Sequence, residues 1–192
     1  MENSEIPYQE TNKFSKLVLD YLNEDEKLKS FVNHFPTLDN FDKQITEKQK
    51  HAVNREVLVE VLQQQNSSVS LSNLSKKNIE SLLNNNTFTV TTGHQLCLFT
   101  GPLYFIYKII STINLVEQLG VKYPKYNFAP VFWMATEDHD FQEINHIHLF
   151  GKKIEWDNKK SGAVGRMNLD GFQSVLTELK SVFGTSENAK KL

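Results

Sequence analysis

The sequence predicts an α/β fold in which a parallel sheet carries the functional loops. Three observations lead to this prediction: a β-branched run at residues 87–92, an apolar helical pattern at 102–119 and a continuous apolar run at 128–135. Two strands joined by one helix form a βαβ unit, and such a unit keeps its strands parallel. Helices are expected before residue 85.

The first 85 residues are predicted to form a helical segment packed on the core. Apolar residues recur there at helical spacing, interrupted by Pro36 and closed by the asparagine run at 84–86. This segment has no internal repeat and no motif for chemistry, so we interpret 1–85 as a structural flank. The expected helices cover residues 12–21, 24–35, 38–65 and 72–83.

The predicted βαβ unit and its loops occupy residues 86–150. The helix is expected to begin near Pro102, with Thr100 as its cap, and to end at Gly120. The strand at 128–135 is apolar throughout, which is typical of a strand buried on both faces. The apolar face of the helix contains Leu103, Ile106, Tyr107, Ile110, Ile113 and Leu115.

The residues that follow predict a hairpin, a loop and a helix. Polarity alternates at 146–150, as in a strand, and residues 154–156 are its expected hairpin partner. A Gly-rich loop at 161–167 and an amphipathic helix at 171–183 come next. Residues 151–192 therefore form the third expected segment.

Composition excludes several classes of protein. A hydrophobic content of 39% and a charged content of 23% are ordinary for a soluble globular chain, and a net charge of −2 leaves no basic surplus for nucleic acid. One cysteine excludes an internal disulfide framework and fits a reducing compartment. The sequence has no signal-peptide pattern and no apolar run near the roughly 20 residues that span a bilayer. We expect a cytoplasmic protein without nucleic-acid or membrane partners.

Polar loops follow both strands of the predicted sheet. Residues 93–101 leave the first strand and residues 136–140 leave the second. Ligands of parallel sheets bind beyond the carboxyl ends of the strands, so we expect the two loops to converge on one pocket.

The second loop crowds charged groups into four consecutive residues, Glu137, Asp138, His139 and Asp140. Such groups repel one another unless a cation or a basic partner is bound, and the crowding shifts pKa values as functional sites do. The alternative is a solvated turn that caps a short helix at 141–145.

The histidines raise the question of zinc. His94, His139, His146 and His148 are the candidates, and an alternating pair on a strand presents two imidazoles on one face. A catalytic zinc site needs three protein ligands, and this spacing matches no familiar site. The pattern argues against zinc.

The first loop and the helix after it offer three further groups. Cys97 is a nucleophile only beside a base, and its leucine neighbours favour a packed thiol. The backbone N–H groups of residues 93–101 can face an anion at the helix start, although no dinucleotide or Walker motif is present. Lys108 is either an anion contact or a solvated charge.

Two blocks of this sequence resemble the bacillithiol-biosynthesis cysteine-adding enzyme family, of the BshC type. The first block, Thr92 to Lys108, reads TGHQLCLFTGPLYFIYK, and the second, Pro130 to His146, reads PVFWMATEDHDFQEINH. A weaker third block, GAVGRM, covers residues 162–167. Their order and spacing make the resemblance specific, and we extend it over the whole chain.

The resemblance implies a ligase that joins L-cysteine to the amine of glucosaminyl-malate in the last step of bacillithiol biosynthesis. It also implies a Rossmann-like core related to class I nucleotidyltransferases, a connecting segment that begins within 151–192, and a homodimer formed through a coiled coil absent from this chain. The related synthetases adenylate with a His-x-Gly-His motif, where this chain has Gly93-His94-Gln95. ATP or ADP as a cofactor therefore stays open, as do two alternatives: a non-catalytic metabolite-binding module and an ATP-using nucleotidyltransferase.

The chemistry of amide formation assigns candidate roles within these blocks. Carboxylates can hold a substrate ammonium, and imidazoles act as acid or base near neutral pH. The expected catalytic residues are Asp138, His139, Asp140 and His94. The expected substrate-binding residues are Gly93, Gln95, Thr100, Gly101, Tyr104, Lys108, Glu137 and His146, and no residue is assigned to a metal.

A doubly wound sheet needs more strands than the one βαβ unit visible here. No heptad run is long enough for a coiled coil. We therefore expect an incomplete core with uncovered apolar surface, and an isolated chain that is inactive and either aggregation-prone or dependent on a partner.

Overall fold

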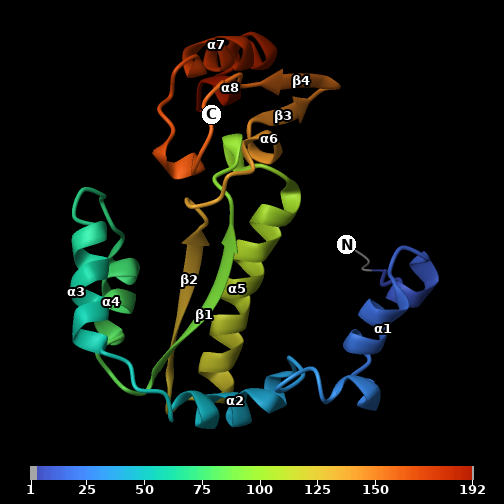
Figure 1. Cartoon of the computed structure of the whole chain (residues 1–192), viewed down its shortest axis with the longest axis vertical. Helices are drawn as coiled ribbons and strands as arrows, with labels where there is room; N and C mark the ends of the chain where they lie inside the picture. The colour runs from blue at the N-terminus through green and yellow to red at the C-terminus, as the bar shows by residue number, and fades with distance from the viewer. Residues whose placement is uncertain (1–3, 192) are drawn as a thin grey trace. The chain divides into compact units, whose positions relative to one another are not determined.

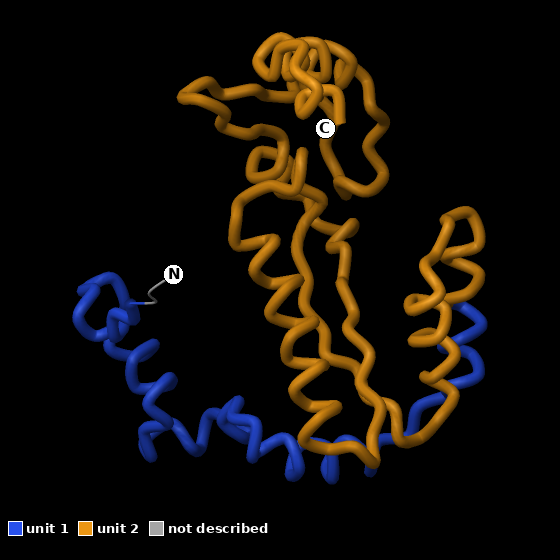
Figure 2. Tube along the Cα trace, turned by 180° about the vertical axis from the view of Figure 1, so that it is seen from behind, with its two compact units in different colours: residues 1–61 blue, residues 62–192 orange. Residues whose placement is uncertain are grey.

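A computed structural model describes residues 4–191, and the chain divides into two compact units, residues 1–61 and 62–192 (Figure 1, Figure 2). This division differs from the three segments expected from the sequence. Residues 62–85 belong to the same unit as the sheet, and residues 151–192 are not separated from it.

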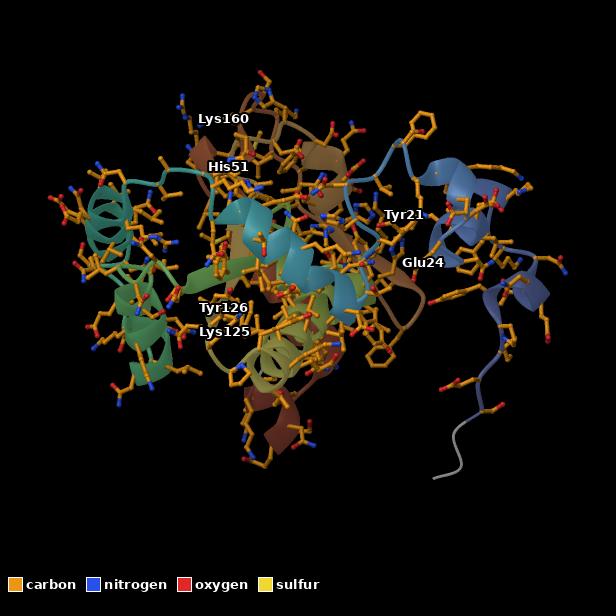
Figure 3. All side chains as sticks on the ribbon, turned by 90° about the horizontal axis from the view of Figure 1, so that it is seen from below. Tyr21, Glu24, His51, Lys125, Tyr126 and Lys160 are labelled. Carbon is orange, nitrogen blue, oxygen red and sulfur yellow. The ribbon has the colours of Figure 1, made fainter. Side chains whose placement is uncertain are left out.

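The first unit consists of short helical pieces. Tyr21 packs beside Phe35, with ring centroids 5.9 Å apart, and His34 Nε2 lies 2.9 Å from Glu47 Oε1; Tyr21 is labelled in Figure 3. The elements are η1 (Tyr8–Thr11), α1 (Lys16–Leu22), η2 (Glu26–Leu28), η3 (Leu38–Asn40), α2 (Phe41–Lys48) and α3 (Arg55–Gln65), the last of which continues into the second unit.

Two helix predictions in this unit are wrong. The helix expected at 24–35 is reduced to the single turn η2, preceded by Glu24 with a positive φ of 56°. The helix expected at 38–65 is broken between α2 and α3 over residues 49–54, where Val53, an apolar side chain, is 47% exposed. Asn54 starts a new helix there by accepting a hydrogen bond from the backbone N–H of Val57 at 3.2 Å.

The second unit is built on a parallel pair of strands. Helix α4 (Asn73–Ser81) is capped by the Ser72 hydroxyl and leads into β1 (Thr87–His94). Helix α5 (Leu103–Lys122) then crosses over to β2 (Asn127–Met134), which pairs with β1 in parallel from Thr87↔Asn127 to His94↔Met134. The predicted α/β fold with a parallel sheet and a crossover helix is confirmed (Figure 1).

The ends of α5 differ from their prediction. Pro102 occupies the N-cap position and Thr100 makes no capping hydrogen bond there. The helix also continues through Gly120, whose missing side chain would meet no atom within 4 Å, and it closes where the Tyr123 N–H donates to the Leu119 carbonyl at 2.8 Å. Because Gly120 keeps helical dihedrals, it does not end the helix.

The face of α5 that packs on the sheet is not the predicted one. Phe105 lies edge-on to Phe132 of β2, with centroids 5.3 Å apart, and Thr112 and Leu119 are buried on the same side. The expected face is exposed, with the exception of half-buried Leu115. Both faces of this helix are apolar, so periodicity alone could not tell which one meets the sheet.

Strand β2 is also less buried than its composition predicts. Ala129 is its only buried residue, and Trp133 and Met134 are 59% and 57% exposed. Among the described residues, the strand has one neighbour, β1, and α5 covers one face of the pair. At the other end of the sheet Tyr126 packs edge-on against Phe88, and Lys125 Nζ lies 4.9 Å from the Tyr126 ring centroid (Figure 3).

The remaining elements form a small second core within this unit. The predicted hairpin is present: β3 (His146–Leu149) pairs antiparallel with β4 (Lys152–Glu155). Ile154, Trp156 and Val175 are buried at the centre of this core, and the Trp156 indole N–H donates to the Asp170 carbonyl at 2.8 Å. The other elements are α6 (Phe141–Ile144), η5 (Val164–Arg166), the predicted helix α7 (Phe172–Phe183) and α8 (Glu187–Lys191).

No helix between residues 4 and 191 is both long and apolar enough to cross a lipid bilayer.

Candidate functional site

Both predicted site loops start at the carboxyl end of the parallel pair. The last residue pairs of the sheet are Gly93↔Trp133 and His94↔Met134, and the Ala135 N–H donates to the His94 carbonyl at 3.1 Å. Gly93 is required at this point, because a Cβ there would lie 2.9 Å from the Trp133 carbonyl oxygen. The two loops therefore leave the sheet side by side.

The first loop turns back on itself through three consecutive residues with positive φ. These are Phe99 at 47°, Thr100 at 71° and Gly101 at 62°. A β-branched residue rarely adopts this conformation, so the loop is strained at Thr100. Gly101 lies against Cys97, since a Cβ there would be 2.5 Å from Cys97 Cβ. The turn thus closes over the cysteine and leads directly into α5.

His94 is the centre of a buried polar cluster. Its Nε2 is hydrogen-bonded to the Tyr104 hydroxyl, and its Nδ1 lies 3.2 Å from the Gln95 carbonyl oxygen and 3.4 Å from Cys97 Sγ. Lys108 donates from Nζ to the Gly93 carbonyl, which fixes the lysine beside the same cluster. Four predicted site residues, Gly93, His94, Tyr104 and Lys108, are brought together here.

Gln95 connects the first loop to the acidic loop and to α6. Its amide Nε2 donates to Glu143 Oε2 at 2.9 Å, and its side chain also hydrogen-bonds Asp138. Asp138 Oδ1 accepts the backbone N–H of Asp140 at 3.0 Å. This backbone N–H is the largest cause of the lowered pKa of Asp138, and burial, the second in size, opposes it; the His139 N–H, the Gln95 amide and the His139 charge lower the pKa further.

The rest of the acidic loop faces solvent. Glu137 accepts a hydrogen bond from the Trp133 indole at 3.3 Å, while His139 and Asp140 are exposed. Asp140 occupies the N-cap position of α6 without a capping hydrogen bond from its side chain. The exposed imidazole and carboxylate are therefore accessible to a ligand.

The third sequence block is attached to the acidic loop by backbone hydrogen bonds. The Val164 N–H donates to the Asp138 carbonyl at 2.8 Å, and the Gly165 N–H donates to the Thr136 carbonyl at 2.9 Å. A Cβ at Gly165 would lie 2.5 Å from Thr136 Cβ, so only glycine allows this approach. Through these two hydrogen bonds the Gly-rich segment fixes the backbone of residues 136–138.

A cavity of about 770 Å³ lies beside the first loop, between the start of α5, strand β3 and helix α7. It contains three of the predicted site residues, Thr100, Gly101 and His146, whereas residues 137–140 are not among those that line it. Its wall is largely apolar, with a thiol, a carboxylate, a hydroxyl and two imidazoles as polar side-chain groups. The lining residues are Cys97, Phe99, Thr100, Gly101, Pro102, Leu103, Glu143, His146, Ile147, His148, Leu149, Leu179 and Phe183.

Several of these lining residues had not been assigned to the site from the sequence. Cys97 was interpreted as a packed thiol, and it is half-buried on the cavity wall. His148 joins His146 through the alternation of β3, with ring centroids 5.3 Å apart, a pairing that the sequence pattern contained. Glu143 could not be found from local pattern, because its partner Gln95 is 48 residues away.

The polar groups do not gather into a metal centre. Within residues 4–191, no three histidine, cysteine, aspartate or glutamate side chains are placed to hold a metal ion. The chemistry that the arrangement can perform is hydrogen bonding, charge pairing and proton transfer around a partly apolar cavity.

The fold and the loops define an α/β domain with a candidate small-molecule site at the carboxyl edge of a parallel sheet. The sequence model of the family described as "Bacillithiol biosynthesis BshC, N-terminal Rossmann-like domain" matches residues 1–192. The chain belongs to this family.

Three similar proteins have the same name, "Putative cysteine ligase BshC". That of Flavobacterium johnsoniae is 52% identical over 189 residues, which cover 97% of this chain and 36% of the relative. The protein of Flavobacterium psychrophilum is 50% identical over 188 residues, covering 96% and 35%, and that of Bacillus cereus is 37% identical over 144 residues, covering 72% and 26%. The chain spans about a third of the length of the first two relatives.

Proposed function

We propose that this chain provides the N-terminal part of a ligase that joins L-cysteine to the amine of glucosaminyl-malate, forming bacillithiol. The observation that carries the proposal is the 52% identity to a protein named as a cysteine ligase, over 189 residues that cover 97% of this chain. So long a match must include the loops at the sheet edge and the residues around the cavity. The proposed reaction forms a carbon–nitrogen bond between two small polar metabolites.

The chemistry of the site supports this reaction. Amide formation needs a deprotonated amine, a positioned acyl carbon and donors for the developing oxyanion. A cavity of about 770 Å³ can hold a small metabolite, and Glu143, oriented by Gln95, places a carboxylate on its wall as a partner for a substrate ammonium. The lowered pKa of Asp138 keeps that side chain ionised at neutral pH, as a second ammonium partner beside exposed His139.

The arrangement does not fit the adenylation chemistry of a His-x-Gly-His motif. That motif uses two histidines, whereas His94, the last residue of β1, is the one histidine within residues 87–101, and it is buried and hydrogen-bonded to Tyr104. We further propose that the enzyme acts in the cytoplasm, as a homodimer formed by a region outside this chain.

A chimaera tests the proposed function. Residues 1–192 replace the matching third of the Flavobacterium johnsoniae relative, and the product is incubated with L-cysteine and glucosaminyl-malate, with and without ATP. Mass spectrometry is expected to detect bacillithiol, and the unaltered relative serves as the positive control. A chimaera that binds these compounds without turnover, or that releases pyrophosphate and transfers a nucleotide instead, would contradict the proposal.

A further inference from the structure

The hydrogen bond between His94 and Tyr104 links a buried imidazole to the protein surface. His94 is 8% exposed, whereas Tyr104, in the first turn of α5, is 52% exposed. Phe105 covers another side of the imidazole, with ring centroids 5.5 Å apart. Among residues 4–191, the Tyr104 hydroxyl thus connects His94 Nε2 to a residue that reaches the surface.

The partners of His94 determine where its proton lies. Nδ1 faces the Gln95 carbonyl oxygen at 3.2 Å and Cys97 Sγ at 3.4 Å; the carbonyl oxygen only accepts hydrogen bonds, and the sulfur can also accept one. In the neutral imidazole, Nδ1 therefore carries the hydrogen and Nε2 carries the lone pair. The Tyr104 hydroxyl must then donate to Nε2, which leaves the lone pairs of its oxygen directed away from His94.

We propose that Tyr104 and His94 together act as the general base of amide formation, with Tyr104 touching the substrate amine and His94 positioned behind it. The ammonium of glucosaminyl-malate gives one proton to Tyr104 Oη. At the same time the Tyr104 hydroxyl proton passes to His94 Nε2. The amine is left neutral with its lone pair free, Tyr104 ends as a neutral phenol, and His94 becomes an imidazolium. This inference rests on the proposed function, because that reaction supplies the ammonium.

The surroundings of the pair suit such a transfer. The imidazolium would donate from Nδ1 to the Gln95 carbonyl and from Nε2 to the Tyr104 oxygen, so both of its hydrogens have acceptors. Lys108 Nζ lies 5.6 Å from the Tyr104 ring centroid, where its charge favours negative charge on Tyr104 and opposes the imidazolium at His94. The other titratable groups nearby are Cys97, 3.4 Å from Nδ1, and Glu143, reached through Gln95.

The first test concerns the tautomer, and it needs no activity. Nitrogen-15 NMR of the chimaera with labelled histidine distinguishes a protonated Nδ1 from a protonated Nε2. We expect His94 in the Nδ1–H form at neutral pH, and Tyr104→Phe is expected to shift the Nε2 signal selectively. Observation of the Nε2–H form would overturn the proposal, since Nε2 could then not accept a proton.

The second test concerns turnover in the chimaera. Tyr104→Phe removes the relay and is expected to lower kcat about 100-fold or more at neutral pH, within the range known for general bases, with a much smaller change in KM. The deficit should shrink as the pH rises, because more of the substrate amine is then neutral without a base. Tyr126→Phe is the matched control, because it removes a tyrosine hydroxyl at the opposite end of the sheet and keeps the ring against Phe88, and it should retain full activity.

A nucleophile that is already deprotonated separates a proton relay from a structural role. With hydroxylamine in place of glucosaminyl-malate, Tyr104→Phe is expected to form cysteine hydroxamate at nearly the wild-type rate. Equal losses with both nucleophiles would overturn the proposal, because a merely distorted site slows both. If the chimaera is active and Tyr104→Phe does not affect it, the proton relay alone is refuted. If the chimaera without this substitution forms no product, the proposed function is refuted, and with it the ammonium that the relay would deprotonate.

Discussion

The Gln95 amide donates a hydrogen bond of 2.9 Å to the Glu143 carboxylate, and so joins the loop after β1 to helix α6 across 48 residues. The same amide hydrogen-bonds Asp138. One neutral side chain therefore holds two carboxylates, one on the cavity wall and one in the acidic loop. Removal of this amide should therefore change the surroundings of both carboxylates, Glu143 and Asp138.

Gln95→Ala is expected to raise the pKa of Asp138 part of the way to its ordinary value. The return is partial because the Asp140 backbone N–H, which is the largest cause of the lowering, is unaffected. A carbon-13 NMR titration of the aspartate carboxyl groups measures the change. Gln118→Ala, on the exposed side of α5, is the control and should leave the Asp138 titration where it is.

Asp138→Asn tests the pH dependence that follows from the same pKa. A carboxyl group with a lowered pKa in the folded state adds stability above its unfolded pKa of about 4, and this contribution disappears as the pH falls through the folded value. The melting temperature of the wild type should therefore exceed that of the variant slightly at pH 7, and the two should converge as the pH falls through the folded pKa of Asp138. A gap that widens on acidification would contradict the assignment.

The same variant tests catalysis at neutral pH. Asp138 is half-exposed at the surface, so its replacement by the isosteric asparagine should leave the chimaera folded while removing most of its activity. Retained activity would show that the acidic loop is a structural turn.

The sequence predicted the parts of the fold that depend on local pattern. The runs at 87–92 and 128–135 became β1 and β2, and their parallel pairing followed from the helix between them. The sequence could not show which face of α5 packs on the sheet or how far β2 is buried, because both depend on which layers cover the sheet. Continuous apolar composition is compatible with several such arrangements.

The candidate site was predictable as a position more than as a set of contacts. The rule for parallel sheets placed residues 93–101 and 136–140 at one edge, where the structure has them leaving the sheet together. The expectation of one pocket lined by both loops is not reproduced by the cavity, which takes the first loop, β3 and α7. Contacts such as Gln95 with Glu143 join distant segments and leave no periodic signal.

Cys97 is predicted to react slowly with alkylating agents. Burial raises the pKa of its thiol, and the Glu143 charge raises it further, so little thiolate is present at neutral pH. Glu143→Gln removes the charge and should speed the reaction with iodoacetamide at pH 8. Because burial is the larger cause, the rate should stay below that of free cysteine. An unchanged rate would mean that Glu143 does not affect the thiol.

Gly165→Ala is expected to destabilise the second unit by about 1–3 kcal/mol, as overpacking does. Its new methyl group would lie 2.5 Å from Thr136 Cβ and 3.0 Å from the Thr136 carbonyl oxygen. Gly120→Ala is the matched control, because it adds a methyl group in open space within α5 and should stabilise the helix by up to about 1 kcal/mol. Thermal unfolding measures both, and equal effects would show that the contact at Thr136 is loose.

The exposed apolar face of α5 leads to the last prediction. Leu103, Ile106, Tyr107, Ile110 and Ile113 lie at helical spacing on the side away from the sheet, and Tyr107 is 63% exposed. A continuous apolar stripe on a soluble protein marks an interaction surface or an aggregation hazard. The relatives in which such a domain occurs are about three times as long as the match, so we expect the remaining two thirds of their chain to cover this face.

The isolated 192-residue chain should therefore bind a hydrophobic dye and self-associate, and Ile110→Lys should reduce both effects. Addition of the remaining two thirds of the Flavobacterium johnsoniae relative in trans should suppress dye binding to the unaltered chain and should fail with Ile110→Lys, which places a charge in the contact. Lys122→Glu, near the end of α5, provides a control for altered charge on the same helix and should still be protected. Light scattering and dye fluorescence measure the outcome. If the isolated chain is monodisperse and binds no dye, the apolar face of α5 does not need a partner. If the added two thirds of the relative suppress dye binding to Ile110→Lys as well as to the wild type, they bind to a different surface.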